Sequence, residues 1–358
     1  MARRYLRPTA FVDTPVGHDG QVARLAGGLC FHAGYELIEV DDDGRRTAVR
    51  LVPVAEADAL PDEVQPIRAR LAAARPPLAL GDRTIRFDQP RAMAILNATP
   101  DSFSDGGSFG GDAEAAAAAG VAAASAGAAI VDVGGESTRP GADPVWEGDE
   151  LARVVPVVER LARAGVAVSV DTRKAAVMEA ALAAGAGIVN DVSALRYDPR
   201  AVALVARAAC PVIVMHAGDG RDLHARTLGP DPLLAVYDWL EARIAALEAA
   251  GVPRARLMID PGIGFGKTLA GNLALVNGLA LLHGLGCPIV LGASRKRMIG
   301  ALSNEAPVDH RLGGSLALAL KGAEQGVQLL RVHDVRETVQ ALHVWRGLRD
   351  QALTPVPA

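Results

Sequence analysis

The clearest indication of the fold is the stretch VAVSVDTRKAAVMEAALAAGAGIVNDV, residues 166–192. It opens with a continuous apolar run, Val166–Val170, which is typical of a strand buried on both faces. The Ala-rich segment Lys174–Ala184 predicts a helix, which Gly185 can end because glycine readily adopts the left-handed conformation. A second apolar run begins at Ile188. The stretch therefore predicts one strand–helix–strand unit of a parallel sheet.

The same unit repeats along the chain from Ala92 onward. Further helices are predicted over Asp149–Ala164, Leu233–Ala250 and Arg311–Gln325. The apolar runs are Met93–Leu96, Ala128–Val133, Val166–Val170, Ile188–Val192, Pro211–Met215, Leu257–Ile259, Pro288–Leu291 and Leu329–Val332. Eight such units over about 250 residues predict an α/β fold, a closed (β/α)8 barrel of the TIM type. The alternative is an open doubly wound sheet, which usually has fewer strands and a Gly-rich phosphate fingerprint that is absent here.

The first 77 residues do not follow this repeat, and we expect them to form an N-terminal extension of unknown role. Tyr35–Val40 and Thr47–Val52, joined by an Asp-Gly turn, predict a β-hairpin. Leu78–Phe87, with Gly81-Asp82 at its turn, predicts a second hairpin that leads into the barrel. The barrel is expected over 78–350, followed by a C-terminal tail at 351–358.

Composition and charge exclude several classes of protein. The formal charge is −4 with both signs dispersed, so nothing indicates a nucleic-acid-binding surface. The three cysteines form no CxxC pair, which favours reduced thiols in the cytoplasm. Met1–Arg7 is not followed by the apolar run of a secretory signal. The uncharged run Ala115–Val131 raises the alternative of a membrane span, but its alanines favour a helix that leads into a strand.

Polar side chains stand at the carboxyl end of every predicted strand. In a barrel these ends meet at one rim, so residues distant in sequence become neighbours. The candidates are Asn97, Asp132, Glu136, Asp171, Asn190, Asp191, His216, Asp260, Ser294, Arg295, Lys296, Arg331, His333 and Asp334. For Asp171 taken alone, capping of the next helix is an equal alternative. Eight consecutive polar strand ends indicate an active site instead.

The residue types suggest two kinds of ligand chemistry. Arg139, Lys296, Arg331 and His333 are cations or potential cations that suit a phosphate or diphosphate, because arginine offers a planar fork to its oxygens. A second group can hydrogen-bond the amide and amino edges of a flat heterocycle. It consists of Asp171, Asn190 and Asp260. For Arg295 alone we favour a surface salt bridge.

Two other patterns resemble known sites less well. Gly262–Thr268 is similar to a nucleotide phosphate loop, but Pro261 stands where that motif requires its first glycine. His216 and His224, with Asp219 and Asp222 between them, suggest a metal site. Their spacing fits no standard motif, so a loop with solvated charges is favoured.

Two signatures in this sequence resemble those of dihydropteroate synthases. They are NATPDSFSDGG at 97–107 and VDVGGESTRPG at 131–141. Shorter runs around Asp171, Asn190, Asp260, Lys296 and Arg331 are similar to that family in the same order. The resemblance covers about Leu78 to Leu348. It implies a transferase that joins (7,8-dihydropterin-6-yl)methyl diphosphate to 4-aminobenzoate and releases diphosphate in folate biosynthesis. It also implies Mg²⁺ as cofactor and a homodimer.

The resemblance also implies a role for each matching residue. Asp171, Asn190, Asp260 and Lys296 would hold the pterin. Asn97 would bind Mg²⁺ and, together with Arg139, Arg331 and His333, the diphosphate. Thr138, Pro140, Phe265 and Ser294 would form the aminobenzoate pocket. The catalytic set would be Arg139, Lys296, Arg331 and His333, and the segments Asn97–Gly111 and Glu136–Pro144 resemble the family's two mobile loops.

Three departures from the family pattern limit this transfer. Ala217–Gly220 replaces the usual Met and Gln-Gly turn, and Arg297 stands where serine is common beside the aminobenzoate carboxylate. The N-terminal extension has no counterpart in the compact members. Two rival functions are a corrinoid-dependent pterin methyltransferase and a catalytically silent pterin-binding paralogue. The methyltransferase has no use for the 137–140 loop or the Arg331/His333 pair, and the filled diphosphate positions weigh against the paralogue.

Overall fold

The computed structural model describes residues 3–99, 112–139, 141–218, 222–225 and 228–354. Eight parallel strands form one sheet in the order β12-β11-β10-β9-β8-β7-β14-β13. A parallel bridge between Ile259 and Ile289 joins the two ends of this order, so the sheet closes into a barrel. The strands are β7 (Arg91–Asn97), β8 (Ile130–Gly134), β9 (Val168–Asp171), β10 (Ile188–Asp191), β11 (Val212–Met215), β12 (Leu257–Asp260), β13 (Val290–Leu291) and β14 (Leu329–Val332). The predicted (β/α)8 barrel is confirmed.

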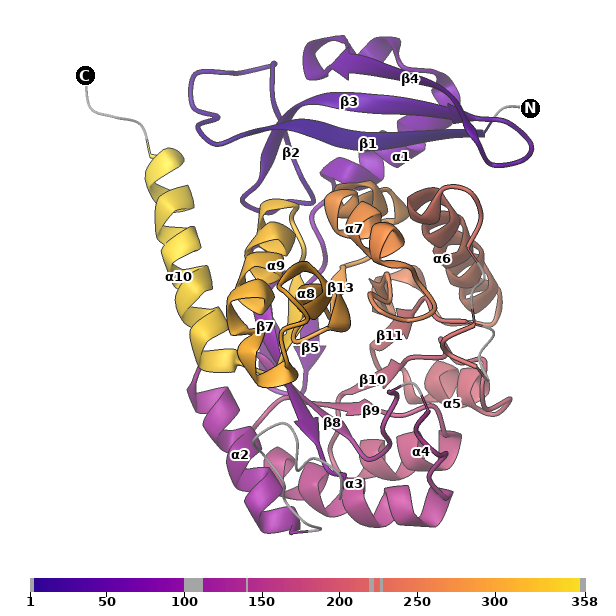
Figure 1. Cartoon of the computed structure of the whole chain (residues 1–358), viewed down its shortest axis with the longest axis vertical. Coiled ribbons are helices and arrows are strands. Elements are labelled where there is room, and N and C mark those ends of the chain that lie inside the picture. The colour runs from indigo at the N-terminus through magenta and orange to yellow at the C-terminus, as the bar shows by residue number, and fades with distance from the viewer. Residues whose placement is uncertain (1–2, 100–111, 140, 219–221, 226–227, 355–358) are drawn as a thin grey trace.

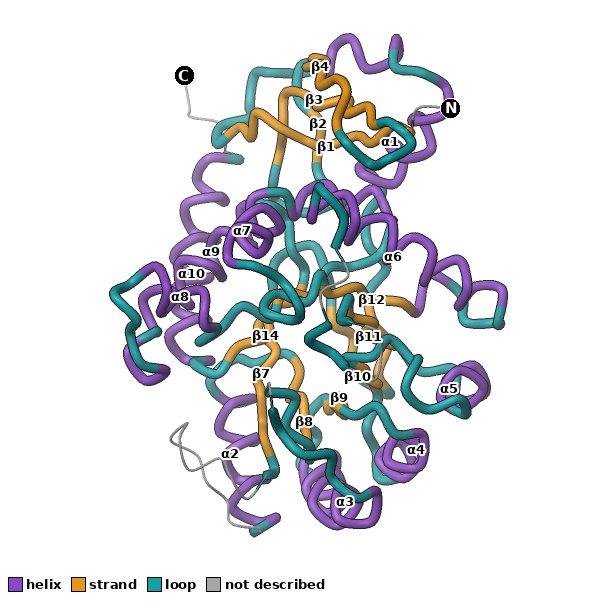
Figure 2. The backbone as a smooth tube through the Cα atoms, turned by 45° about the vertical axis from the view of Figure 1, so that its right-hand side comes forward, coloured by secondary structure: helices purple, strands orange, loops and turns teal. Residues whose placement is uncertain are grey.

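Helices surround this inner ring of strands (Figure 2). They are α2 (Ala113–Ser125), α3 (Glu147–Arg163), α4 (Ala175–Ala183), α5 (Ala201–Ala208), α6 (Pro232–Ala249), α7 (Leu269–Asn277), α8 (Arg297–Leu302), α9 (Leu312–Glu324) and α10 (Val335–Ala352). Local sequence explains where they begin. The Asp231 carboxylate accepts from the backbone N–H groups of Leu233 and Leu234 at 3.1 and 3.2 Å, and Pro232 occupies the first turn of α6.

The uncharged run Ala115–Val131 and the three cysteines are ordinary parts of this fold. The uncharged run Ala115–Val131 is helix α2 followed by the start of β8, as predicted. Among the described residues, no helix combines the length and apolarity needed to cross a membrane. Cys30, Cys210 and Cys287 are buried free thiols.

The amino-terminal end of the barrel is filled by an apolar layer. One residue from, or next to, the start of each strand contributes: Met93, Ile130, Ala167, Ile188, Ile213, Met258, Val290 and Leu329. The predicted second hairpin, β5 (Leu78–Leu80) and β6 (Arg83–Ile85), packs its Leu78 and Ile85 against this layer, and Phe87 follows them. This end is therefore plugged, and the carboxyl end is left for the site.

The N-terminal residues form a small antiparallel sheet. The predicted hairpin is confirmed as β3 (Phe31–Val40) and β4 (Arg46–Pro53). Two further strands, β1 (Arg3–Val12) and the short β2 (Ala23–Arg24), pair with β3 and were not predicted. The short helices η1 (Val54–Ala59), η2 (Asp62–Val64) and α1 (Gln65–Ala72) follow.

This sheet packs directly on the barrel's helices, above α6, α7 and α9 in Figure 1. The Tyr5 hydroxyl donates to Asp238 of α6 at 2.8 Å, and its ring meets that of Tyr237 edge to face. At the other end of the sheet, the Arg349 guanidinium of α10 donates to the Leu29 carbonyl at 3.1 Å. Buried residues of the sheet and of the barrel belong to one continuous apolar cluster.

Candidate active site

Alternation along the strands places a polar layer directly above the apolar one. Successive side chains of a strand point to opposite faces, so residues two positions apart share a face. The positions two residues after the apolar layer are Ile95, Asp132, Ser169, Asn190, Met215, Asp260, Gly292 and Arg331. Asp132, Ser169, Asn190 and Asp260 are all buried. Five of the eight residues at this level are thus polar, whereas none in the apolar layer below it is.

Arg331 joins the polar side chains of neighbouring strands. Its Nε donates to Asp132 Oδ2 and its Nη2 to Asp171 Oδ2, each at 2.7 Å. Asn190 Nδ2 donates to the same Asp132 oxygen at 2.9 Å. Residues from β14, β8, β9 and β10 therefore form one connected cluster. Burial raises the pKa of Asp171, and the nearby carboxylates of Asp132 and Asp191 act in the same direction against Arg331.

Asp132 is the member of this cluster to which the sequence assigned no role. It is wholly buried and accepts from both Arg331 and Asn190. A carboxylate only accepts hydrogen bonds, so the Asn190 amide must turn its NH₂ group toward Asp132 and leave its carbonyl oxygen for a ligand. The available signal was its place two residues after the buried Ile130 on the same strand.

Lys296 and Asp260 lie beside this cluster. The Asp260 carboxylate accepts from the Gly262 backbone N–H at 2.6 Å, and Lys296 Nζ lies 4.4 Å from the centre of the Phe265 ring. Burial, together with the charge of Arg331, lowers the pKa of Lys296 to about 8, although Asp260 and Asp171 oppose the shift. The pKa of Lys296 therefore depends on the charges of Arg331, Asp260 and Asp171.

Two further predicted residues meet just beyond the ends of β13 and β14. The His333 Nδ1 and the Ser294 Oγ are 3.0 Å apart, and Ser294 also accepts from the His333 backbone N–H. Next to them, Arg295 forms a two-pronged ion pair with Asp334, at 3.0 and 2.5 Å. Arg295 is thus held in a salt bridge, as favoured from the sequence, although the pair is half-buried and does not lie on the open surface.

The loop after β8 comes close to Phe265 through a histidine that the sequence did not single out for the site. The backbone carbonyl of Thr138 lies 3.0 Å from His224 Nε2, and the His224 ring stacks on Phe265 with centroids 5.2 Å apart. His224 therefore links Thr138 to Phe265. The Arg139 side chain is exposed, in contrast to Arg331, and Pro140 lies outside the described residues.

Asn97 ends β7 at the same rim. Its register partner on β8 is Gly134, which in turn pairs with Asp171 on β9. The predicted loop residues beyond Thr99, up to Gly111, lie outside the described residues.

The phosphate-loop-like segment Gly262–Thr268 and the pair His216 and His224 make other contacts than their sequence patterns suggested. Lys267 of the phosphate-loop-like segment is buried and donates to the carbonyls of Gly262 and Phe265 at 2.8 and 3.0 Å and to His216 Nδ1 at 2.9 Å. Burial, with Lys267 nearby, lowers the pKa of His216 to about 3, so its neutral ring accepts this bond. His224 does not join them, because its Nε2 contacts the Thr138 carbonyl. Within the described ranges, no three His, Cys, Asp or Glu side chains gather as metal ligands.

Comparisons with known proteins agree with this geometry. Residues 93–333 match the family model described as pterin binding enzyme. The chain is 44% identical over 263 residues to dihydropteroate synthase of Escherichia coli K12, covering 73% of this chain and 92% of that protein.

Solved structures give the same result. The chain is similar to dihydropteroate synthase of Xanthomonas albilineans with 4-aminobenzoic acid, with a TM-score of 0.71 and 46% identity over 79% of this chain and all of that one. A structure of the same enzyme in complex with 7,8-dihydropteroate matches with a TM-score of 0.69 and 44% identity, again over 79% of this chain and 100% of that one. The chain belongs to the dihydropteroate synthase family of pterin-binding enzymes.

Proposed function

We propose that the pterin site of this transferase is formed by Asn190 and Asp260 of the polar layer together with Asp171 and Lys296 beside it. The enzyme condenses (7,8-dihydropterin-6-yl)methyl diphosphate with 4-aminobenzoate to 7,8-dihydropteroate and diphosphate. The observation that supports this assignment best is the Arg331 cluster, because it joins three predicted residues from three strands within hydrogen-bond distance. The fixed Asn190 amide would offer its carbonyl oxygen to a ring N–H.

Departure of the diphosphate is the step that these residues would promote. An aryl amine is a weak nucleophile, so a stabilised pterin-methyl cation has to form as the C–O bond to the diphosphate breaks. Arg331 uses its Nε and one Nη2 hydrogen on the two aspartates, and its other N–H groups remain for phosphate oxygens. His333 and Arg139 would add further donors to the leaving group, an electrostatic contribution of several kcal/mol. Asp171 and Asp260 would stabilise the electron-poor ring.

The aminobenzoate would enter between the loop after β8 and the loop after β12. Thr138, Pro140, Phe265 and Ser294 are its proposed neighbours. The stack of His224 on Phe265 and its contact with Thr138 support this, because they bring the two loops together. Arg297 is exposed at the start of α8, and its pairing with the aminobenzoate carboxylate stays a prediction.

Mg²⁺ fits the oxygen ligands at this rim. Mg²⁺ prefers hard oxygen ligands and is often held by one or two side chains together with substrate phosphates. The side-chain oxygen of Asn97, at the end of β7, is such a ligand. Asn97 is the register partner of Gly134, which in turn pairs with Asp171. When bound, the ion would neutralise charge that grows on the departing diphosphate.

We further propose a cytoplasmic homodimer. The three buried free thiols fit a reducing compartment. Leu269, Leu302 and Leu312, on the neighbouring elements α7, α8 and α9, are exposed apolar residues that a second copy could cover. Light scattering of the purified protein measures this state directly.

Product analysis tests the proposed function. The purified protein is mixed with the pterin diphosphate, 4-aminobenzoate and Mg²⁺, and dihydropteroate and diphosphate are quantified with and without a chelator. We expect equal amounts of the two products and a loss of both when Mg²⁺ is removed. Binding of the pterin without release of diphosphate would instead identify a catalytically silent paralogue.

A further inference from the structure

A single carboxylate closes the base of the loop that carries Thr138 and Arg139. Glu136 follows β8 at the start of this loop, and its Oε1 accepts from the backbone N–H of Val145, at the end of the loop, at 3.1 Å. The same side chain accepts from Arg173 Nε and Nη2, both at 3.1 Å, and lies 3.2 Å from Lys174 Nζ. Glu136 therefore ties together the two ends of this loop, of which residues 137–139 and 141–144 are described.

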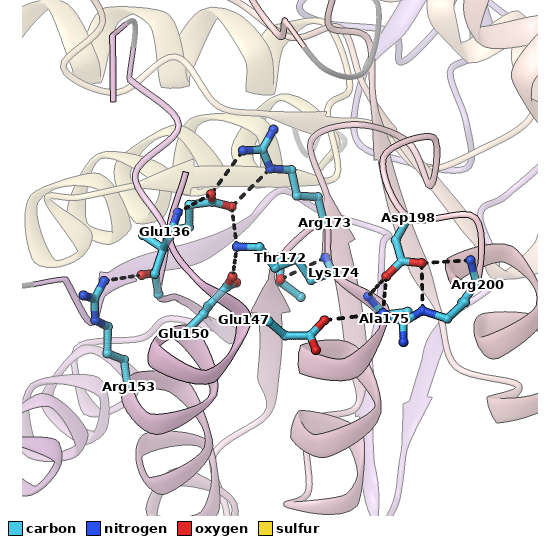
Figure 3. A network of polar contacts seen from close by, with 12 residues as sticks. Glu136, Glu147, Glu150, Arg153, Thr172, Arg173, Lys174, Ala175, Asp198 and Arg200 are labelled. Carbon is cyan, nitrogen blue, oxygen red and sulfur yellow. Dashed lines mark hydrogen bonds and ion pairs between the residues drawn. The ribbon is translucent and has the colours of Figure 1, made fainter. Parts of the chain in front are cut away.

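This tie is anchored in the protein interior. The Glu136 side chain is only 5% exposed, and Lys174 bridges it to the fully buried Glu150 of α3, with 2.5 Å to Glu150 Oε2. Figure 3 shows Glu136 in contact with Arg173 and Lys174, and Lys174 in contact with Glu150. Burial disfavours the charged form, but the bonds from Arg173 and Val145 outweigh it and lower the pKa of Glu136. At neutral pH the Glu136 carboxylate is thus charged, and the bonds from Arg173 and Val145 hold it in place.

The anchor comes from the turn that directly follows β9, the strand that ends in Asp171. Arg173 and Lys174 lie two and three residues beyond Asp171, which is bonded to Arg331. A stretch of only three residues therefore connects Asp171 of the Arg331 cluster to the base of the loop. At its far side, the loop meets His224 through the Thr138 carbonyl, and His224 stacks on Phe265.

We propose that Glu136 is a positioning residue that holds Thr138 and Arg139 in a fixed place relative to the pterin. It touches neither substrate, and this role rests on the proposed functions of Thr138 and Arg139. A purely structural ion network would stabilise the fold without favouring one substrate. A positioning role predicts a selective loss, confined to steps that need the loop.

Kinetics of Glu136 variants separate these two roles. In Glu136→Ala we expect kcat/KM for 4-aminobenzoate to fall by up to about 100-fold, because small misplacements of reacting groups are costly. The affinity for 6-hydroxymethyl-7,8-dihydropterin, which lacks the diphosphate, should stay at the wild-type value. Glu136→Gln keeps an acceptor for the Val145 N–H and should show a smaller loss with the same selectivity.

Asp198→Asn is the matched control. Asp198 accepts from the Ala175 backbone N–H at 2.9 Å and pairs with Arg200 at 2.8 Å, near the same helix α4 but away from the loop (Figure 3). Its kinetics should be those of the wild type. Hydrogen exchange adds a readout independent of activity: amides of 137–145 should exchange faster in Glu136→Ala, while those of α4 should not.

The possible failures are distinguishable. A wild-type protein that makes no dihydropteroate overturns the proposed function. An active wild type with a folded Glu136→Ala variant of unchanged aminobenzoate kinetics overturns the positioning role alone, and so does an equal loss of dihydropterin affinity. If Glu136→Ala does not fold, the kinetics and exchange of Glu136→Gln decide in the same way.

Discussion

The charge of Arg331 is shared between two carboxylates inside the barrel. Its guanidinium bonds Asp132 and Asp171 at 2.7 Å each, so one buried cation faces two carboxylates, and the pKa of Asp171 is raised by burial and by Asp132. Removal of one partner of such a buried pair leaves uncompensated charge, which typically costs about 3–5 kcal/mol. Arg331 is therefore part of the buried ion cluster of the site, in addition to the role that we propose for it toward the diphosphate.

We expect Arg331→Ala to lower turnover far more than it weakens binding of the dihydropterin. Loss of a group that stabilises developing charge typically costs 100-fold or more, on the order of 3 kcal/mol. Single-turnover rates and dihydropterin affinity, measured separately, check this. Arg331→Lys is the comparison, because it keeps the charge but lacks the planar fork that can hold both aspartates and a phosphate together. A variant in which only a Michaelis constant changes would disprove the role.

The lowered pKa of Lys296 predicts a pH dependence. Burial brings this pKa to about 8, so the ammonium is charged below that pH and loses its proton above it. If the charged form binds the pterin, kcat/KM for the pterin diphosphate should fall as pH rises through about 8. In Lys296→Arg the decline should move to much higher pH, because arginine stays protonated. An unchanged alkaline decline in that variant would rule Lys296 out as its cause.

At this scale the sequence predicts positions better than contacts. The convergence of strand ends in a barrel was enough to predict that Asp171, Asn190, Asp260 and Arg331 lie at one rim. The bridging position of Asp132 and the stack of His224 on Phe265 depend on side-chain rotamers and on loop paths, which no local pattern encodes. His224 in particular lies in a loop whose sequence departs from the family.

Among the elements, the hairpin β5–β6 has a clear structural task. Its Leu78 and Ile85, with Phe87 after it, cover the apolar layer at the amino-terminal end of the barrel. A barrel open at both ends would leave this layer in water, whereas the hairpin covers it.

Phe87→Ala tests the plug. Phe87 is 3% exposed, and truncation of a buried phenylalanine typically costs about 3–5 kcal/mol. Urea unfolding should show a loss of this size, and the affinity for dihydropterin should be retained under folding conditions. Leu51→Ala on β4 is the control, since Leu51 is 69% exposed and should change stability by less than about 0.5 kcal/mol. Equal stabilities of the two variants would contradict the plug.

The sequence predicted the elements that have continuous apolar runs. It missed a strand whose apolar residues are interrupted by charged ones. Helix α6 was placed within one residue at both ends, because Asp231, Pro232 and Gly251 mark its limits. Strand β1 was missed because its charged residues hide the pattern: Arg4 pairs with Glu39 and Arg7 with Glu36 across the strand pair. Such pairing partners are far apart in sequence and become visible only in the fold.

Across the whole molecule, the N-terminal sheet and the barrel share one core. Tyr5 reaches Asp238 of α6, Arg46 pairs with Asp231 at the start of α6, and Arg349 of α10 binds the Leu29 carbonyl. We therefore propose that residues 1–77 are a structural part of the barrel domain and do not act as a detachable module.

Deletion of residues 1–77 should make the barrel insoluble or strongly destabilised. It would expose the faces of α6, α9 and α10 that the sheet now covers, and large apolar surfaces promote aggregation. Expression, solubility and thermal unfolding of the shortened chain check this. Tyr5→Phe serves as a mild companion variant, with an expected loss of about 1 kcal/mol from the lost hydrogen bond, since Asp238 keeps its ion pair with Arg3. A soluble, active shortened chain would show that the sheet is dispensable.

A crystal structure with the dihydropterin diphosphate bound tests the central claim most directly, namely that residues from separate strands form one substrate site. We predict the ring within hydrogen-bond distance of Asn190 and Asp260, and the diphosphate beside Arg331 and His333. A ligand bound elsewhere, for example at the amino-terminal end near β5–β6 with these four side chains untouched, would contradict the account.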